Sequence, residues 1–233
     1  MQHLEAPRNS RGVDLAGKRG RKPALVDRLG FWLSTSRKVD GLWVGSTESK
    51  PQPGLRRVED ALRLIKDHDS LHYLRVIHNL ERVWVHLIPG ALGQYDPSLG
   101  TCVLDERFVL SETTTLERIA STIVHEATHA RLDKWGIRYV EKERSRIEAI
   151  CLRRELNFAA RLPGSDSFRE EIASTLEWYA GNNDYFSDVN FRERDDQGNV
   201  ETLRHLGTPD WLISFLMRMV RRRRLRASAP PRS

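Results

Sequence analysis

Two histidines and a glutamate occur together in the stretch IVHEATHARL, residues 123–132. His125 and His129 are four residues apart, and Glu126 directly follows the first histidine. On an α-helix, side chains at this spacing lie one turn apart on the same face, so both imidazoles can direct a nitrogen at a common point. Two neutral imidazoles placed in this way can bind zinc, and the glutamate can reach a water molecule beside the metal without being a ligand. The stretch therefore predicts a zinc site.

Zinc in an enzyme usually takes a third protein ligand, which we expect from the next helical segment. Glu148 follows His129 after 18 intervening residues, enough for a turn and a second helix that crosses back over the first. Its neighbours are largely apolar, and an unpaired carboxylate on a half-buried face would be costly unless a metal bound it. We therefore assign the metal ligands to His125, His129 and Glu148. The other glutamates of the segment lie among lysines and arginines and are expected to face solvent: Glu141, Glu143 and Glu155.

The chemistry expected of these residues is metal-assisted hydrolysis of a peptide or protein substrate. Zinc polarises the scissile carbonyl and lowers the pKa of water toward about 7, while Glu126 takes a proton from the attacking water and delivers it to the leaving amine. A further donor should stabilise the oxyanion. Our choice is Tyr139, ten residues past His129; the alternatives left open are Tyr179, Tyr185 and His205.

The pattern His125-Glu126-x-x-His129, followed by 18 residues and a glutamate, resembles the gluzincin group of zinc metallopeptidases. The resemblance covers about residues 80–160. It implies an α+β, zincin-like fold: a small, mostly antiparallel sheet packed on the active-site helix, an edge strand that holds extended peptide, and further helices C-terminal. Two features depart from it. The segment GALGQ, residues 90–94, lacks the amine-binding glutamate of the aminopeptidase branch, and Leu152 stands where the thermolysin branch usually has an aspartate that orients the first histidine.

The elements around the motif follow from caps and periodicity. Thr114 and Glu117 form a capping-box pattern at the start of the motif helix, and Gly136 is a plausible stop. At about 100° per residue the two histidines lie opposite an apolar stripe. That stripe consists of Leu116, Ile119, Ile123, Ala127 and Ala130.

Upstream of the motif we predict a short helix over residues 58–65, then strands in LHYLRVIHNL (71–80) and RVWVHLI (82–88). The segment TCVLDERFVL (101–110) predicts a third strand or a hairpin around Asp105 and Glu106, and GQYDPSLGTCVLDE (93–106) could line the cleft with an edge strand.

Downstream of the motif we predict helices over residues 166–180 and 208–220, separated by the polar segment 181–199, read as a long loop that could close over the site. Its aromatic residues are more readily explained as anchors to the core. They are Tyr185, Phe186 and Phe191.

The net charge of +6 is concentrated at the chain ends. Residues 218–233 hold seven Arg and no acid, and residues 1–24 hold six Lys or Arg against two acids, which leaves residues 25–217 with about −5. We expect a disordered basic N-terminal segment (1–24), a metallopeptidase domain (25–217) and an Arg-rich tail (218–233). The tail is read as solvated, with weak contact to an anionic membrane surface or nucleic acid as alternatives. The alternative function is thus a zinc-stabilised binding module with little catalysis.

The location expected from sequence is cytoplasmic. The first twenty residues contain no apolar segment of the kind found in secretory signals. The longest apolar stretch, residues 211–220, is interrupted by Ser214 and Arg218 and is much shorter than the roughly 20 residues needed to span a bilayer. Cys102 and Cys151 are two thiols without a disulfide framework, which fits a reducing compartment.

Overall fold

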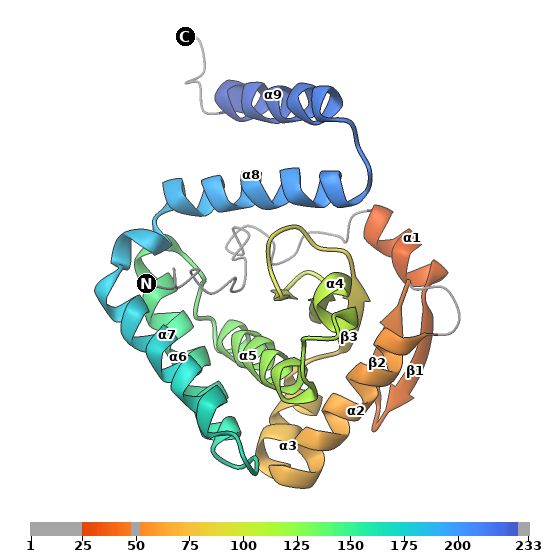
Figure 1. Ribbon diagram of the computed structural model, residues 1–233, viewed down its shortest axis with the longest axis vertical. Coiled ribbons are helices and arrows are strands. Elements are labelled where there is room, and N and C mark those ends of the chain that lie inside the picture. The colour runs from red at the N-terminus through yellow and green to blue at the C-terminus, as the bar shows by residue number, and fades with distance from the viewer. Residues whose placement is uncertain (1–24, 48–51, 228–233) are drawn as a thin grey trace.

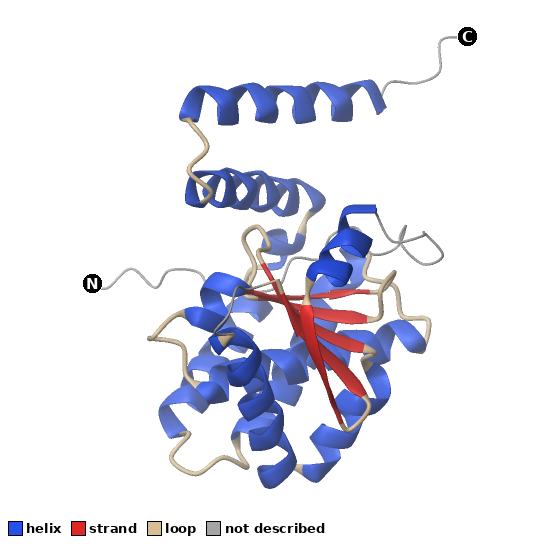
Figure 2. Ribbon diagram, turned by 90° about the vertical axis from the view of Figure 1, so that its right-hand side faces the viewer, coloured by secondary structure: helices blue, strands red, loops and turns tan. Residues whose placement is uncertain are grey.

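The computed structural model describes residues 25–47 and 52–227, so the prediction for residues 1–24 lies outside the described residues. The described chain has an α+β fold, with one five-stranded sheet and nine α-helices (Figures 1 and 2). The strands lie in the order β1-β2-β3-β5-β4. Their bounds are Thr35–Val39 (β1), Leu42–Ser46 (β2), Arg82–His86 (β3), Gly93–Asp96 (β4) and Thr101–Asp105 (β5).

The sheet is mixed rather than mostly antiparallel as we expected. Strands β2, β3 and β5 run parallel, and the edge strands β1 and β4 pair antiparallel to their neighbours. The parallel pairing of β2 with β3 requires a crossover connection, which helices α2 (Pro53–His68) and α3 (Ser70–Asn79) supply. The prediction of an edge strand within residues 93–106 is confirmed by β4.

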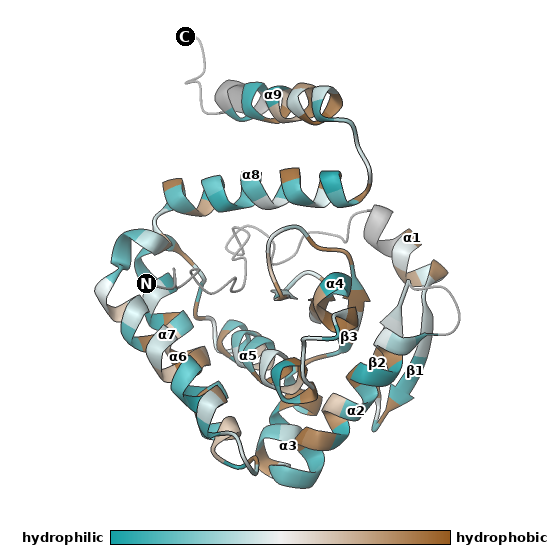
Figure 3. Ribbon diagram, in the orientation of Figure 1, coloured by the Kyte–Doolittle hydropathy of each residue, from teal (hydrophilic) through white to brown (hydrophobic). Residues whose placement is uncertain are grey.

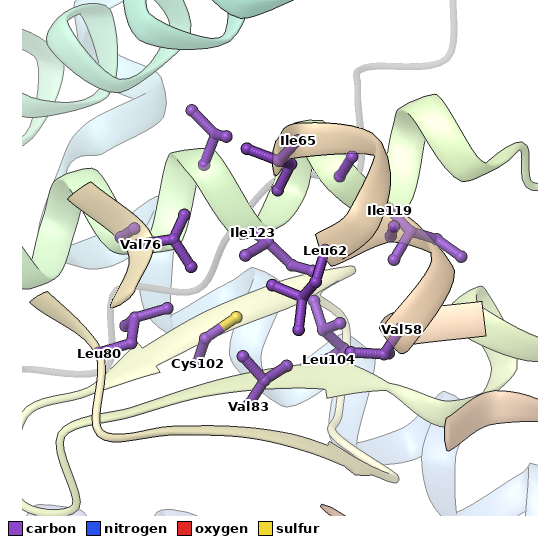
Figure 4. Close-up of a cluster of buried hydrophobic side chains, with 14 of the residues drawn as sticks. Val58, Leu62, Ile65, Val76, Leu80, Val83, Cys102, Leu104, Ile119 and Ile123 are labelled. Carbon is purple, nitrogen blue, oxygen red and sulfur yellow. The ribbon is translucent and has the colours of Figure 1, made fainter. Parts of the chain in front are cut away.

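The main core lies between the sheet and three helices: α2, α3 and α5 (Leu116–Lys134) (Figure 4). Ile119 and Ile123 of α5 meet α2 side chains above the sheet. A smaller apolar cluster lies on the opposite face of the sheet. There Phe31 of α1 (Leu25–Leu33) packs against Trp84. The predicted apolar stripe of the motif helix is thus confirmed in the core at Ile119, Ile123, Ala127 and Ala130.

Residues 71–79 belong to helix α3, so the strand predicted over residues 71–80 is wrong. The Asp69 carboxylate accepts a hydrogen bond from the backbone N–H of His72 and caps the helix start. Tyr73, Val76 and Leu80 then face the core at a helical spacing of three and four residues. Aromatic and β-branched residues favour strands only weakly, and here the cap and this spacing decide the outcome.

After β5 the chain enters helix α4 (Glu106–Leu110) rather than a hairpin. Asp105 accepts hydrogen bonds from the backbone N–H groups of Arg107 and Phe108, which start the helix, and from that of Ile88 in the preceding loop. The strand predicted over residues 101–110 is confirmed only for 101–105, and a capping carboxylate explains the change of direction.

The C-terminal half is helical: α6 (Glu141–Ala159), α7 (Asp166–Gly181), a 3-10 helix η2 (Asn183–Phe186), α8 (Asp188–His205) and α9 (Asp210–Ala227). The polar segment 181–199 is therefore not a long loop, because Ser187 caps α8 by accepting from the N–H of Asn190. Its aromatic residues do act as anchors. Phe186 is buried against Tyr179, and Phe191 packs near Tyr139.

Helices α8 and α9 form an arm that projects from the body (Figures 1 and 2). Helix α9 continues to Ala227, so most of the predicted tail is helical. Among the described residues, no helix has the length and apolar character required to cross a membrane.

Candidate metal centre

Helix α5 carries the motif and is covered on both sides. Thr115, one residue later than predicted, is its N-cap and accepts from the N–H of Arg118, while Gly136 takes a φ of +82° just beyond its C-terminus. The sheet and α2 cover the apolar face, and α6 covers the opposite face that carries the histidines. His125 and His129 are only 1% and 7% exposed in consequence.

The structure brings the three predicted ligands together. The Nε2 atoms of His125 and His129 lie 3.1 Å apart. Glu148 of α6 reaches between them, with Oε2 at 3.2 Å from Nε2 of His125 and Oε1 at 3.4 Å from Nε2 of His129. Glu148 is 2% exposed, so the carboxylate is buried as completely as the imidazoles.

These separations fit a zinc ligand set. Atoms bound to one zinc ion at about 2.0 to 2.1 Å in tetrahedral geometry are about 3.3 to 3.4 Å from one another. The Nε2–Nε2 distance and the two nitrogen–oxygen distances fall within a few tenths of an ångström of that spacing, with each histidine facing a different oxygen of Glu148. Two imidazole nitrogens and one carboxylate form a donor set that could hold a divalent cation.

Cys151 lies close enough to be a competing donor. Its Sγ lies within 4.8 Å of the ligand nitrogens of His125 and His129, and it follows Glu148 by one turn of α6. The thiol is buried, which raises its pKa well above the usual range. Both Glu148 and Cys151 are therefore candidates for a third donor beside the two histidines.

The residue that orients His125 is Glu155, which we expected to face solvent. Nδ1 of His125 donates to Oε1 of Glu155, and Oε2 of Glu155 accepts from the hydroxyl of Ser121 at 2.8 Å. A carboxylate on Nδ1 fixes the tautomer that leaves the Nε2 lone pair for a metal. Glu155 thus performs the role that Leu152 cannot. The signal available in the sequence was its position seven residues past Glu148, two helical turns along the same face.

Tyr139 lies at the centre in the segment between α5 and α6. Its hydroxyl donates to Oε1 of Glu148 at 2.5 Å, and its ring meets that of His129 edge-on. Burial, together with Glu148, raises the pKa of Tyr139 well above its usual range, so the hydroxyl keeps its proton. In this arrangement Tyr139 positions the carboxylate, and its role as an oxyanion donor stays a prediction.

The other two tyrosines considered as donors lie in a neighbouring aromatic cluster, and the histidine lies at the surface. Tyr179 and Tyr185 stack on each other in a cluster with Phe186, with ring centroids 5.5 Å apart for the two tyrosines. His205 is exposed at the end of α8.

Glu126 points toward the edge strand β4. Its carboxylate accepts a hydrogen bond from the backbone N–H of Tyr95, and the residue is 1% exposed. Gly93 allows this close approach, because a β-carbon there would lie 2.6 Å from Cγ2 of Thr122 and 3.4 Å from Oε1 of Glu126. The motif glutamate therefore lies between the histidine pair and the sheet edge.

The electrostatics favour one positive charge within the cluster. Burial opposes it, yet Glu155 and Glu148 raise the pKa of His125 well above its ordinary value. Burial, with His125 nearby, lowers the pKa of His129 to about 4. Although burial alone would raise it, His129 and His125 lower the pKa of Glu148 to about 2. A bound cation would supply the charge that otherwise resides on His125.

Burial raises the pKa of Glu126 to about 8, far above that of a free carboxyl group. A cation between His125 and His129 would favour the ionised form and lower this pKa. A carboxyl group that titrates near neutral pH is suited to proton transfer.

Comparison of the chain with protein-family models, with curated proteins and with solved structures finds no match.

Proposed function

We propose that the protein is a zinc-dependent peptidase of the gluzincin type, with His125, His129 and Glu148 as metal ligands and Glu126 as general base. The observation that carries the proposal is the set of distances, 3.1, 3.2 and 3.4 Å, among the three ligand residues. A five-stranded sheet whose antiparallel edge strand lies beside the motif helix also agrees with a zincin-like arrangement.

The chemistry assigned to the chain's own residues is proton transfer and substrate positioning. A zinc ion at this centre supplies a Lewis acid that polarises a carbonyl and lowers the pKa of water toward about 7. Glu126 accepts a proton from the water that attacks the scissile carbonyl and delivers it to the leaving amine nitrogen. Glu155 holds the His125 ring, and Tyr139 holds the Glu148 carboxylate.

The edge strand β4 is the proposed site for substrate backbone. The carbonyl of Leu92 accepts from the N–H of Asp105 in β5, and Tyr95 directs its N–H to Glu126. Backbone groups alternate along a strand, so those of Gly93 and Tyr95 face away from β5, toward the space beside the motif helix. An extended peptide added along this edge would have its backbone next to Glu126.

The first test is metal content and peptidase activity of the full chain. Purified protein loaded with zinc should retain about one ion per chain, measured by mass spectrometry, and should cleave a fluorogenic peptide library. Glu126→Gln should retain the metal and lose activity by about 10²- to 10⁴-fold, because it removes the general base. Full activity in Glu126→Gln would remove that residue from the mechanism, and full zinc retention in His129→Ala would overturn the site.

The second test separates Glu148 from Cys151 as the third ligand. Cobalt replaces zinc in many such sites, and a bound thiolate produces an intense near-ultraviolet charge-transfer band. We expect no such band from the wild-type protein, unchanged metal affinity in Cys151→Ser and a large loss in Glu148→Ala. A thiolate band that disappears in Cys151→Ser would assign the ligand to Cys151.

We also propose a second function, carried by a separate observation on α9: attachment to an anionic membrane surface. Ile213 and Met217 are buried on the side facing α8. On the opposite side, Trp211, Phe215 and Met219 are 72%, 53% and 36% exposed. Figure 3 shows α9 as more hydrophobic than the mostly polar α8.

Arginines lie among these exposed apolar residues. At about 100° per residue, Arg218 and Arg222 fall within the same arc of about 100° as Trp211, Phe215 and Met219. Both arginines are exposed, and the one acid of the helix, Asp210, lies outside this arc. Aromatic and apolar groups flanked by arginine suit the boundary between anionic headgroups and acyl chains. Pairing with a second copy would bring like charges together.

Vesicle sedimentation tests this surface. The full chain should bind vesicles that contain phosphatidylglycerol and not those of phosphatidylcholine alone. Trp211→Ala combined with Phe215→Ala should abolish binding, whereas Trp32→Ala, at another exposed tryptophan, should retain it. The result that would contradict a membrane partner is no vesicle binding together with DNA binding that the Trp211 and Phe215 changes do not affect. Nucleic acid would then be the partner of this surface.

A further inference from the structure

A small pocket lies between α3, α5 and α6, on a side of α5 that carries neither the histidine pair nor Glu126. It encloses about 40 Å³, room for about three water-sized groups. Its lining is partly apolar, and most of its polar groups belong to arginines and one histidine. The lining includes His72, Arg75, Arg131, Trp135 and Arg154.

Three arginines, one from each helix, converge on this pocket. Arg75, Arg131 and Arg154 are all half-buried. The guanidinium of Arg131 lies over the ring of Trp135, 4.3 Å from its centroid, which restricts its orientation. Within the described part of the chain none of the three forms an ion pair with a carboxylate. The nearest acid, Asp69, is already bonded to His72.

Asp69 offsets only part of the mutual repulsion of these groups. Burial, and after it Arg154 and Arg131, lower the pKa of Arg75. Three cations brought together from three helices cost free energy unless an anion lies among them. Planar guanidinium groups donate in pairs to oxyanion oxygens, so the geometry favours phosphate, sulfate or carboxylate over a halide.

A buried histidine narrows the choice of anion. His72 is 6% exposed, and its Nδ1 lies 2.7 Å from Oδ2 of Asp69, so Nδ1 carries the proton that it donates. Its Nε2 is buried and has no hydrogen-bond partner among the described residues. Burial lowers the pKa of His72, so the ring is neutral near pH 7 and Nε2 is an acceptor that needs a donor.

We propose that this pocket binds inorganic phosphate in its hydrogen phosphate form. The oxygens accept from Arg75, Arg131 and Arg154, and the P–O–H group donates to Nε2 of His72. Sulfate has the same shape but carries no hydrogen near neutral pH, so it cannot satisfy His72. The adjoining open groove of about 640 Å³ is lined by the same His72, Arg75 and Arg154 and gives solvent access to them.

The consequence of binding is mechanical as well as electrostatic. Arg131 and Arg154 lie on α5 and α6, the two helices that also carry the candidate metal ligands. An anion that bridges them stabilises the packing of α5 on α6 from the side away from the metal. The proposal does not rest on peptidase activity, because none of these arginines contacts the metal residues in the structure.

The test is phosphate titration of the full chain, metal-free and zinc-loaded, by calorimetry and thermal unfolding at matched ionic strength. We expect saturable binding with a stoichiometry of one, a raised Tm, and sulfate binding at least about tenfold weaker, because one hydrogen bond is lost. Arg75→Gln and Arg154→Gln should each weaken phosphate binding by about tenfold or more. Arg153→Gln, at the exposed neighbour of Arg154, should bind as the wild type does.

Several results would overturn the proposal: no saturable phosphate binding, equal affinity for sulfate, or equal loss in the Arg153 control. Circular dichroism of each variant checks the fold, and Arg75→Lys provides a second variant that keeps the charge but removes the planar fork. The proposal predicts intermediate affinity for Arg75→Lys, while wild-type affinity would show that charge alone acts. Loss of peptidase activity plays no part in these readouts, so failure here is distinct from failure of the metal site.

Discussion

The two helix pairs α5–α6 and α8–α9 differ in how deeply their charged groups are buried. Between α5 and α6 polar groups are largely buried, because His125 contacts the carboxylates of both Glu148 and Glu155. Between α8 and α9 the contact is made by apolar side chains such as Ile213, and the charges lie at the surface, where Arg224 pairs with Asp195 and Asp196.

Charged groups are therefore expected to affect stability differently in the two helix pairs. Buried ionic groups stabilise little by themselves, because desolvation offsets their attraction, but loss of one partner is severe. Surface ion pairs contribute between zero and about 1 kcal/mol. The α5–α6 pair is therefore specific and sensitive to substitution, whereas the arm belongs to the less stable part of the fold.

The largest contrast should come from matched cavity-forming changes in the two pairs. Ile123→Ala in α5 removes a side chain that is 0% exposed and should lower the free energy of unfolding by about 2 to 5 kcal/mol. Ile213→Ala in α9 should leave global unfolding in urea nearly unchanged and should speed hydrogen exchange in α8 and α9. Equal effects on global stability would show that the arm unfolds with the body.

Metal removal should have the second-largest effect, and it should destabilise the α5–α6 pair without affecting α8–α9. If zinc binds at the α5–α6 centre, a free concentration of 100 to 1,000 times Kd stabilises the fold by about 2.7 to 4.1 kcal/mol. A chelator should therefore lower Tm and speed hydrogen exchange in α5 and α6 while exchange in α9 stays the same. A Tm that does not respond to the chelator contradicts the metal centre.

Glu155→Gln tests whether the supporting carboxylate matters as the geometry indicates. The change removes the anion that holds Nδ1 of His125 and should weaken zinc affinity by about 10- to 100-fold. Competition with a chromophoric chelator measures this ratio. Glu141→Gln, at a glutamate of the same helix that lies away from the metal residues, is the control and should not change the affinity.

The smallest effect is expected at the surface pairs of the arm. Arg221→Gln combined with Arg224→Gln removes the ion pairs to Asp195 and Asp196. The two arginine side chains are 69% and 41% exposed, respectively. The cost should be below about 1 kcal/mol and should fall further at high salt. Zinc affinity should stay at the wild-type value, and a change there would couple the two helix pairs.

The parts of the centre that follow from local spacing could be predicted from the sequence. His125 and His129 lie one turn apart on any helix, so their convergence depended only on predicting α5. Glu148 required a second helix to return across the first, and the structure places it there. Glu155 was missed because the flanking Arg153 and Arg154 suggested an exposed face, although residues 148 and 155 share one face of α6.

The errors in the fold have physical causes of the same kind. The strand predicted at residues 71–80 rested on propensity, which the Asp69 cap and the core spacing of Tyr73 and Val76 outweigh. The parallel pairing of β2 with β3 depends on the crossover through α2 and α3, a long-range arrangement that no local pattern reports. Helix α8 was predicted as a loop because its sequence is mostly polar and it buries few residues.

Gly93 determines the separation between β4 and the carboxyl group of Glu126 by having no side chain. Thr122, the residue that a methyl group at position 93 would strike, is held in place by its hydroxyl bond to the carbonyl of Arg118. A methyl group at position 93 would therefore move β4 away from α5 and expose the carboxyl group of Glu126 to solvent. If Glu126 acts as the proposed general base, its distance from a peptide bound along β4 depends on the absence of a side chain at position 93.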